Sequence, residues 1–440
     1  MRVVVVGADE VGRSLARFFS SRGDDAVLLD AEASAITEAE EGLDVLTLVG
    51  NPLHRAVLEM TRPAEAGVFY VTTGSDATNL AVGAMAHAMG ARRVIARVDD
   101  AAFFRGVSGI ERGVLGIDAV MCPARLQSNE LLRQIRALEV PWVGDFAEFA
   151  VQVVLCPVSA QSKWIDGPAT GVKLADGCSV RGVVRDGFLR PVHEIPSLTD
   201  HDLILLAGPS AGIPDALRKL GHISRLNRVV VVGGGSSGRQ LCEQLGSSGA
   251  RLQLLESNRA VAVDLSERLP GVHVIHADGT NLDTLRDLQI ETAQVVVAVT
   301  QTDEVNLMVA LVSRQLGVPH TLTVVHRPGY SDIYQHLGID GVVSRHEVTA
   351  RMMATAAVAD RAQSAGHLPG TQHAVVEFVV PEGGPTAMGQ IAVPSHALLV
   401  AHCRGQEIVQ GPLEPGDVLV FAVLPRSIPK LAAAVAGARR

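Results

Sequence analysis

A glycine-rich turn in the second half of the chain has the residue types that bind a phosphate group. Gly233, Gly235 and Gly238 follow the apolar run 228–232 and precede a helical pattern. A phosphate needs backbone N–H donors with no side chain in the way, and a helix N-terminus supplies such donors and a positive dipole end. A strand, this glycine spacing and a helix together are typical of a dinucleotide-binding βαβ unit.

Two acidic residues further along could complete such a site. Glu256 ends the next apolar run, 18 residues after Gly238, where a carboxylate can bind ribose hydroxyls and disfavours a 2′-phosphate. Asp278 lies in the motif Ala277-Asp278-Gly279-Thr280, at the end of the third predicted strand and on the adenine side of the crevice. The second half is therefore predicted to bind a nucleotide. The alternative is a fold that kept its shape and lost its ligand.

The same layout opens the chain, 226 residues earlier. Gly7 and Gly12 follow a run of valines, and Asp30 ends the next predicted strand. Asp9 stands where the second glycine is expected, and it adds bulk and negative charge next to phosphates. An adenosine portion could still bind here, or this copy could be a scaffold without affinity for a nucleotide.

Arginines close to the turns could contact a terminal phosphate, as an ATP or ADP sensor would require. Arg13 and Arg239 each follow the last glycine of their turn, and the alternative for each is a solvated helix residue. Arg97 closes the fifth predicted strand of the first half and could face the crevice, whereas Val324 holds the equivalent position in the second half.

Polar residues in the turns and at strand ends complete the set of candidate ligand-binding residues. They are Ser236, Ser237, Thr300 and Asp303 in the second half, and Asn51 and Thr73 in the first. His54, His326 and His346 are each open to two interpretations, as site residues or as surface and capping residues.

Apolar runs alternate with helical patterns over about 120 residues in each half, which predicts two doubly wound parallel sheets. A helical segment follows each sheet, at 125–138 and at 347–362, and a small β-rich module comes next. In these modules the runs 149–155 and 374–380 have the pattern of exposed strands. The predicted α/β fold thus has two tandem Rossmann-like lobes, each followed by a small α+β module. The predicted domains are 1–142, 143–225, 226–367 and 368–440.

Composition narrows the range of functions. A net charge of −9 and an aromatic content of 3% argue against a nucleic-acid partner, which needs a basic face and stacking rings. The 5 cysteines show no metal-binding spacing, so we expect reduced thiols and no metal site. The chain begins with a strand rather than a signal peptide, and no apolar run reaches about eighteen residues, so a soluble cytoplasmic protein is expected.

No catalytic motif accompanies the glycine turns. The sequence contains no G-x-S-x-G, no H-E-x-x-H and no Walker lysine. No separate substrate domain supplies an acid/base pair for hydride transfer. A nucleotide bound without chemistry suggests a sensor and not an enzyme.

The tandem order and several motifs together resemble those of Trk-type potassium-uptake regulatory proteins. The motifs are VVVVG-x-x-x-x-G, the acid at Asp30 or Glu256, the residues 277–280 and the run 299–306. Such proteins contain RCK domains, each with a Rossmann N-lobe, also called KTN, and a small C-lobe. The resemblance covers essentially the whole chain.

The resemblance implies a regulatory subunit on the cytoplasmic side of the cell membrane, docked on a membrane K⁺-translocating subunit of the Trk or Ktr type. Family members bind NAD(H) or adenine nucleotides such as ATP and ADP in their N-lobes, and ligand exchange changes the shape of a ring and gates transport. They assemble through helices beside the N-lobe sheet, which makes 125–138 and 347–362 candidate assembly elements here. Tandem chains are expected to form a homo-oligomeric ring that is a dimer of tandem chains or larger.

Two other functions stay open at the level of the sequence. One is a nicotinamide-dependent dehydrogenase with duplicated domains, which would need a substrate pocket with an acid/base pair. The other is a gating module of a K⁺ channel or a K⁺/H⁺ antiporter, which would share the fold and differ in its partner.

Overall fold

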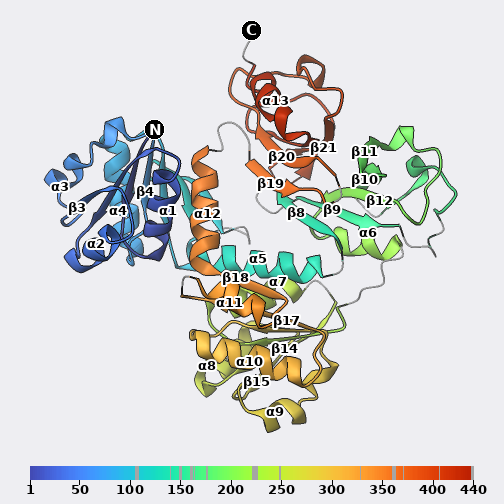
Figure 1. Cartoon of the computed structure of the whole chain (residues 1–440), viewed down its shortest axis with the longest axis horizontal. Coiled ribbons are helices and arrows are strands. Elements are labelled where there is room, and N and C mark those ends of the chain that lie inside the picture. Colours follow the sequence, from blue (N-terminus) through green and yellow to red (C-terminus); the bar gives the residue numbers. More distant parts are fainter. Residues whose placement is uncertain are drawn as a thin grey trace. The chain divides into compact units, whose positions relative to one another are not determined.

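The computed structural model describes residues 1–104, 109–138, 140–147, 151–158, 162, 164–174, 177–220, 226–246, 249–327, 329–358, 363–369, 371–405 and 407–437. These residues form two compact units (Figure 1). The first comprises Met1–Leu132 with Leu226–Ala357, and the second comprises Arg133–Arg225 with Val358–Arg440. Each half of the chain therefore contributes to both units. No helix in the described part of the chain combines the length and the apolarity that a bilayer crossing requires.

The first unit contains two Rossmann-like lobes, and the lobe from the first half has a sheet in the order β3-β2-β1-β4-β5-β7-β6. Neighbouring strands run parallel except at the edge, where β6 pairs antiparallel with β7. Its strands are β1 (Arg2–Val6), β2 (Asp25–Asp30), β3 (Leu46–Val49), β4 (Val68–Val71), β5 (Val94–Arg97), β6 (Ile110–Val114) and β7 (Ile117–Met121). Its helices are α1 (Glu10–Ser20), α2 (Ala33–Glu40), α3 (Arg55–Met60) and α4 (Asp76–Ala88).

The lobe from the second half repeats this plan with a wholly parallel sheet in the order β15-β14-β13-β16-β17-β18. Its strands are β13 (Arg228–Val232), β14 (Arg251–Glu256), β15 (Val272–His276), β16 (Val295–Ala298), β17 (His320–Val325) and β18 (Gly341–Ser344). Its helices are α7 (Ser236–Leu245), α8 (Arg259–Arg268), α9 (Leu282–Asp287), α10 (Asp303–Gln315) and α11 (Tyr330–His336). The central strands are buried on both faces because helices cover both sides of a parallel sheet.

The predicted fold class is confirmed, with two local differences. The helices after the glycine turns begin at Glu10 and Ser236, two residues before the third glycine of each turn, and not after it as expected. The third glycine of each turn therefore lies inside the first helical turn. The edge strand β6 was not predicted, because Ile110–Val114 carries charged residues and a glycine that interrupt the apolar run.

Two long helices cross between the Rossmann lobes. Helix α5 (Pro123–Ala137) follows β7 of the first lobe, yet Gln127 on it accepts a 2.6 Å hydrogen bond from the hydroxyl of Ser237 on α7. Helix α12 (Arg345–Val358) follows β18 of the second lobe, yet the carbonyl of Met353 accepts a 3.2 Å hydrogen bond from the hydroxyl of Tyr70 on β4. Figure 1 shows α12 in orange beside α1, and α5 in cyan beside α7. The lobes of one chain are thus joined by reciprocal exchange of a helix; residues 359–362 of the predicted segment lie outside the described residues.

The second unit contains two small β-rich lobes, here called the C-lobes, each with a five-stranded sheet among the described residues. The first has β8 (Trp142–Phe146), β9 (Val151–Pro157), β10 (Ser179–Arg185), β11 (Phe188–Pro191), β12 (Leu203–Pro209) and α6 (Ile213–Lys219). The second has β19 (Gln363–His367), β20 (Ala374–Val379), β21 (Leu398–Arg404), β22 (Glu407–Ile408), β23 (Val418–Val423) and α13 (Ile428–Val435).

The expectation of exposed strands in these modules is wrong. Strand β9 is buried over nearly its whole length, and β20 over most of it, while residues 149 and 150 lie outside the described part. Each sheet has one face covered by its own helix, and the other face joins a shared apolar core that includes Val153 and Leu205 from one C-lobe and Val375 and Val420 from the other. Each C-lobe buries one face of the other's sheet, and the sequence pattern of neither C-lobe alone indicates this burial.

Candidate nucleotide-binding site

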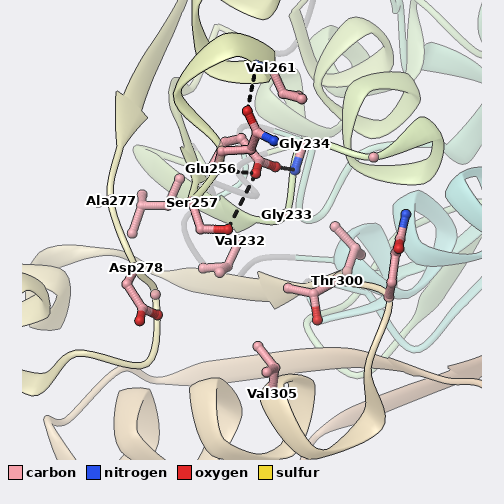
Figure 2. Close-up of a pocket in the computed structure, with 16 residues that line it drawn as sticks. Val232, Gly233, Gly234, Glu256, Ser257, Val261, Ala277, Asp278, Thr300 and Val305 are labelled. Carbon is pink, nitrogen blue, oxygen red and sulfur yellow. Dashed lines mark hydrogen bonds between the residues drawn. The ribbon is translucent and has the colours of Figure 1, made fainter.

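A pocket of about 370 Å³ lies at the carboxyl ends of β13, β14, β15 and β16 in the second lobe (Figure 2). The strand order reverses between β13 and β16, and such a switch point is where open α/β sheets bind ligands. The pocket is lined by Val232, Gly233, Gly234, Gly235, Leu255, Glu256, Ser257, Asn258, Val261, Ala277, Asp278, Gly279, Val299, Thr300, Gln301 and Val305.

The three glycines of the turn have different physical roles. Gly233 has a φ of +113°, and a Cβ on it would lie 2.8 Å from the carbonyl oxygen of Val299. A Cβ on Gly238 would lie 2.0 Å from the carbonyl oxygen of Gly233. Gly235 has a φ of −65°, and a Cβ on it would meet nothing within 4 Å. The fold requires the first and third glycines, whereas the space beside the middle one is open.

Glu256 closes the turn from the end of β14. One carboxylate oxygen accepts a 2.7 Å hydrogen bond from the backbone N–H of Gly234, and the other accepts one of 2.7 Å from the N–H of Asn258 (Figure 2). These bonds hold the carboxylate at the pocket wall, where its remaining lone pairs can accept bonds from ribose hydroxyls. Its charge also opposes a 2′-phosphate at this position.

Asp278 lines the opposite part of the pocket, after β15. Its carboxylate accepts hydrogen bonds of 2.8 Å and 2.7 Å from the backbone N–H and the hydroxyl of Thr280. These two bonds hold the pKa of Asp278 below its ordinary value. The pocket therefore has two acidic side chains on its wall, and its described lining includes no lysine, arginine or histidine.

Thr300 contributes to the pocket through a turn that a buried asparagine organises. Asn306 accepts 2.8 Å hydrogen bonds from the backbone N–H and the hydroxyl of Thr300, and it donates to the carbonyl of Val324 at 3.2 Å. Asp303 is buried, and its two carboxylate oxygens accept from the backbone N–H groups of His326 and Arg327 at 2.7 and 3.0 Å. Asp303 thus holds the loop after β17 and is not among the lining residues.

The remaining candidates of this lobe lie at the start of α7, outside the pocket lining. Ser236 is exposed, and Gly238 is buried inside the first turn of the helix. The hydroxyl of Ser237 donates to Gln127 of α5 and so serves the contact between the lobes. Arg239 is half-buried, and its guanidinium lies 3.8 Å from Glu243 on the same helix.

In the glycine turn of the first lobe, an ion pair is present at the position that is open beside Gly235 in the second lobe. Asp9 is the N-cap of α1, and its side chain accepts a 3.0 Å hydrogen bond from the N–H of Gly12. Its other carboxylate oxygen forms an ion pair with Arg97 at the end of β5. The prediction that Arg97 faces the crevice is consistent with this position. Asp30 repeats the role of Glu256 and accepts a 2.6 Å bond from the N–H of Ala8.

The other candidates of the first lobe are bonded within the protein. Arg13 is largely buried and forms ion pairs with Glu10 and, at 2.8 Å, with Glu38. Burial lowers the pKa of Arg13, but the hydrogen bonds to Glu10 and Glu38 and the charges of these two glutamates together outweigh burial, so the net shift is upward. Asn51 accepts from the N–H of Leu53 at 3.0 Å, and Thr73 donates to Asn79 at 2.6 Å, as Thr300 does to Asn306. Gly7 has a φ of +108°, close to the φ of +113° of Gly233 at the equivalent position.

None of the three candidate histidines lines the pocket. His54 is exposed and precedes α3 without capping it. The ring of His326 lies 3.0 Å from the carbonyl of Thr300. Burial lowers the pKa of His346 at the start of α12, and the nearby charges of Asp9 and Glu10 act in the opposite direction.

Several lining residues were not among the sequence-based candidates. Ser257 and Asn258 directly follow β14, and Gln301 lies three residues after the end of β16. The signal was available, because every residue just after a parallel strand faces the same edge of the sheet. The glycine motif and the residues beside it do not indicate these three polar residues.

This fold and this pocket define a tandem Rossmann-type protein with a pocket at the switch point of its second parallel sheet. The TrkA-N domain model matches residues 3–123 and again 229–345, so the chain belongs to the TrkA-N domain family. The resemblance noted in the sequence is thereby confirmed.

Relatives match along almost the whole chain. A "Trk system potassium uptake protein TrkA homolog" of Archaeoglobus fulgidus is 28% identical over 417 residues, covering 92% of each chain. A "Trk system potassium uptake protein TrkA" of Halomonas elongata is 26% identical over 455 residues, covering 97% of each.

Solved structures share the fold. The "GsuK channel bound to NAD" matches with a TM-score of 0.60 at 19% identity, covering 99% of this chain and 79% of that one. The "Crystal Structure of the GsuK RCK domain" matches with a TM-score of 0.58 at 18% identity, covering 98% and 95%. At this identity the matches show a common fold.

Proposed function

We propose that the chain is a cytosolic, nucleotide-sensing regulatory subunit of a Trk/Ktr-type potassium uptake system, which binds a nucleotide in its second Rossmann lobe and gates a membrane K⁺-translocating subunit. The observation that carries this proposal is Gly235. It caps α7 with no side chain and leaves open space beside a helix N-terminus, and no contact within the fold requires a glycine there. A phosphate group would fit that space and would be bound by backbone N–H groups.

The chemistry of the pocket favours NAD(H) over ATP. The described lining has Glu256 and Asp278 and no basic side chain, so phosphate charge is balanced only by N–H groups and the dipole of α7. ATP carries more negative charge than NAD, and it would be repelled more strongly by the two carboxylates. ADP is intermediate. Glu256 would accept from the adenosine ribose.

A regulatory role agrees better with the pocket than hydride transfer does. The carboxylates that line it are engaged by backbone N–H groups of Gly234 and Asn258 and by Thr280, and none is paired with a lining histidine, lysine or tyrosine in the described residues. The relatives that match over most of the chain carry the name of potassium uptake proteins.

Gating requires that the nucleotide bind one shape of the protein better than another, and about 1–3 kcal/mol of coupling is the usual scale. Helix α12 offers a direct route, because it leaves β18 of the nucleotide lobe and packs on the other lobe through Met353 and Tyr70. We infer that a homo-oligomeric ring transmits this change to the membrane subunit.

Calorimetric titration of the full chain with NADH, NAD⁺, ATP and ADP tests the proposal. We expect binding of NAD(H) at about micromolar affinity and at least about a 100-fold loss in Gly235→Asp. Gly246→Asp is a matched control, because Gly246 lies at the other end of α7 and also has open space beside its Cβ position. Equal affinity in the Gly235→Asp variant and the wild type would refute the assignment of the pocket.

A further inference from the structure

A chain of four charged groups runs from the glycine turn of the first lobe to the start of α12. Asp9 pairs with Arg97, whose guanidinium also lies 3.2 Å from Asp99. Asp99 in turn forms a 2.8 Å ion pair with Arg345, the first residue of α12. The side chain of Arg97 is only 11% exposed, so its charge depends on these acidic partners and not on water.

The second lobe has none of these four charged groups at the equivalent positions. Matching hydrogen bonds identify the equivalent positions. Asn79 donates to the carbonyl of Arg97 as Asn306 does to that of Val324, and Asp76 accepts from the N–H of Asp99 as Asp303 does from that of His326. The equivalents of Asp9, Arg97, Asp99 and Arg345 are therefore Gly235, Val324, His326 and Pro123, the last being the first residue of α5. None of the four equivalent positions carries an aspartate or an arginine, which points to a single function for the set.

The position of Asp9 is the position that a phosphate takes in a βαβ nucleotide site. Its carboxylate accepts from the N–H of Gly12 at the positive end of α1, and a guanidinium balances its charge. The backbone of Asp9, with φ −71° and ψ −179°, matches that of Gly235, with φ −65° and ψ −176°. The two turns thus have the same shape, and only the first carries its own anion.

We propose that Asp9 is a built-in substitute for a nucleotide phosphate, so that the first lobe excludes nucleotides and one chain binds one nucleotide. This inference rests on the proposed function of the second lobe. A covalently attached carboxylate is always present at the helix N-terminus, so a free phosphate must displace it and break the pair with Arg97. Through Asp99 and Arg345 the same ion chain holds α12 against the first lobe whatever the nucleotide concentration is.

Calorimetric stoichiometry with NADH, and with ADP as a second probe, tests this inference. We expect one site per chain in the wild type, two in Asp9→Gly, and one in the double variant Asp9→Gly/Gly235→Asp, in which only the first lobe can bind. Two sites in the wild type overturn the inference, and so does a folded Asp9→Gly protein that still has one site.

The reverse exchange covers the case in which Asp9→Gly does not fold. Gly235→Asp/Val324→Arg places the same ion pair in the second lobe, and we expect it to bind no NADH and to melt at a higher temperature than Gly235→Asp alone. Binding at the wild-type affinity would overturn the inference. The proposed function fails separately: a wild-type chain without binding, whose Asp9→Gly variant gains one site, refutes nucleotide binding by the second lobe and still supports the role of Asp9.

Discussion

The two halves of the chain show which residues the fold needs and which a ligand needs. Both Rossmann lobes keep a left-handed first glycine, an acid that accepts from the turn, and a buried asparagine that orders the turn after the fourth strand. They differ at Asp9 and Gly235, where one turn is closed by a side chain and the other is open. The shared residues therefore belong to the fold of both lobes, whereas the nucleotide pocket is assigned to the second lobe only.

The largest expected effect comes from breaking a scaffold glycine. Gly238→Ala should lower the free energy of unfolding of the first unit by about 3 kcal/mol, because its Cβ would lie 2.0 Å from a backbone oxygen. Gly12→Ala should act similarly, since its Cβ would lie 1.8 Å from the carbonyl of Gly7. Gly235→Ala is the control and should cost less than about 1 kcal/mol. Thermal unfolding followed by circular dichroism measures all three, and equal losses would contradict the division of roles.

A second effect compares the C-lobes. Asp417 is buried and bonded to Arg404 and His402, and these partners, Arg404 first, hold the pKa of Asp417 far below its ordinary value. The equivalent Asp202 is paired with Arg185. Burial, the largest single influence, raises the pKa of Asp202, but the hydrogen bonds from Arg185 and Thr199 and the charge of Arg185 together outweigh it, so the net shift is downward.

Both carboxylates therefore stabilise the fold above the unfolded pKa of about 3.9, and this stability is lost as pH falls below it. Asp417→Asn should lower the free energy of unfolding at pH 7 by about 2–4 kcal/mol and flatten the acid limb of the pH profile. Asp202→Asn should have a smaller effect, because the partners of Asp202 among the described residues, Arg185 and Thr199, include no histidine. The two tryptophans both lie in the first C-lobe, so urea unfolding followed by their fluorescence reports on this unit. A larger loss of unfolding free energy in Asp202→Asn than in Asp417→Asn would contradict this prediction.

A third effect sharpens the comparison between the Rossmann lobes. Glu256→Gln keeps one acceptor for the N–H of Gly234 and removes the charge. The preference for NADH over NADPH should then fall by about tenfold, or about 1.4 kcal/mol, because a 2′-phosphate is no longer repelled. The ratio of the two dissociation constants measures it. Asp30→Asn is the matched control in the first lobe and should leave this ratio unchanged.

Much of this architecture was predictable from local pattern, because the valine runs before Gly7 and Gly233 and the helical periods after them are properties of short segments. The exchange of α5 and α12 was not predictable, since the partners Gln127–Ser237 and Tyr70–Met353 are more than 100 residues apart in sequence. The mutual burial of the C-lobes was missed for the same reason. At the site, the glycines and Glu256 followed from spacing, whereas the pairing of Asp9 with Arg97 depends on how β5 lies beside β4 and was not predicted.

The smallest expected effect concerns the tie between the first lobe and α12. Asp99 and Arg345 are 37% and 29% exposed, so a double-mutant cycle of Asp99→Ala and Arg345→Ala should give a coupling energy of about 0.2–1 kcal/mol in thermal unfolding. The more informative readout is NADH affinity. Arg345 is the first residue of α12, the helix that leaves the nucleotide lobe. If the position of α12 is coupled to nucleotide binding, Arg345→Ala should change the affinity for NADH. Asp118→Ala is the control and should leave this affinity unchanged, because Asp118 lies in the first lobe and accepts a hydrogen bond from the N–H of Val94. Unchanged affinity in both variants would mean that the ion chain fixes the first lobe without being coupled to the second.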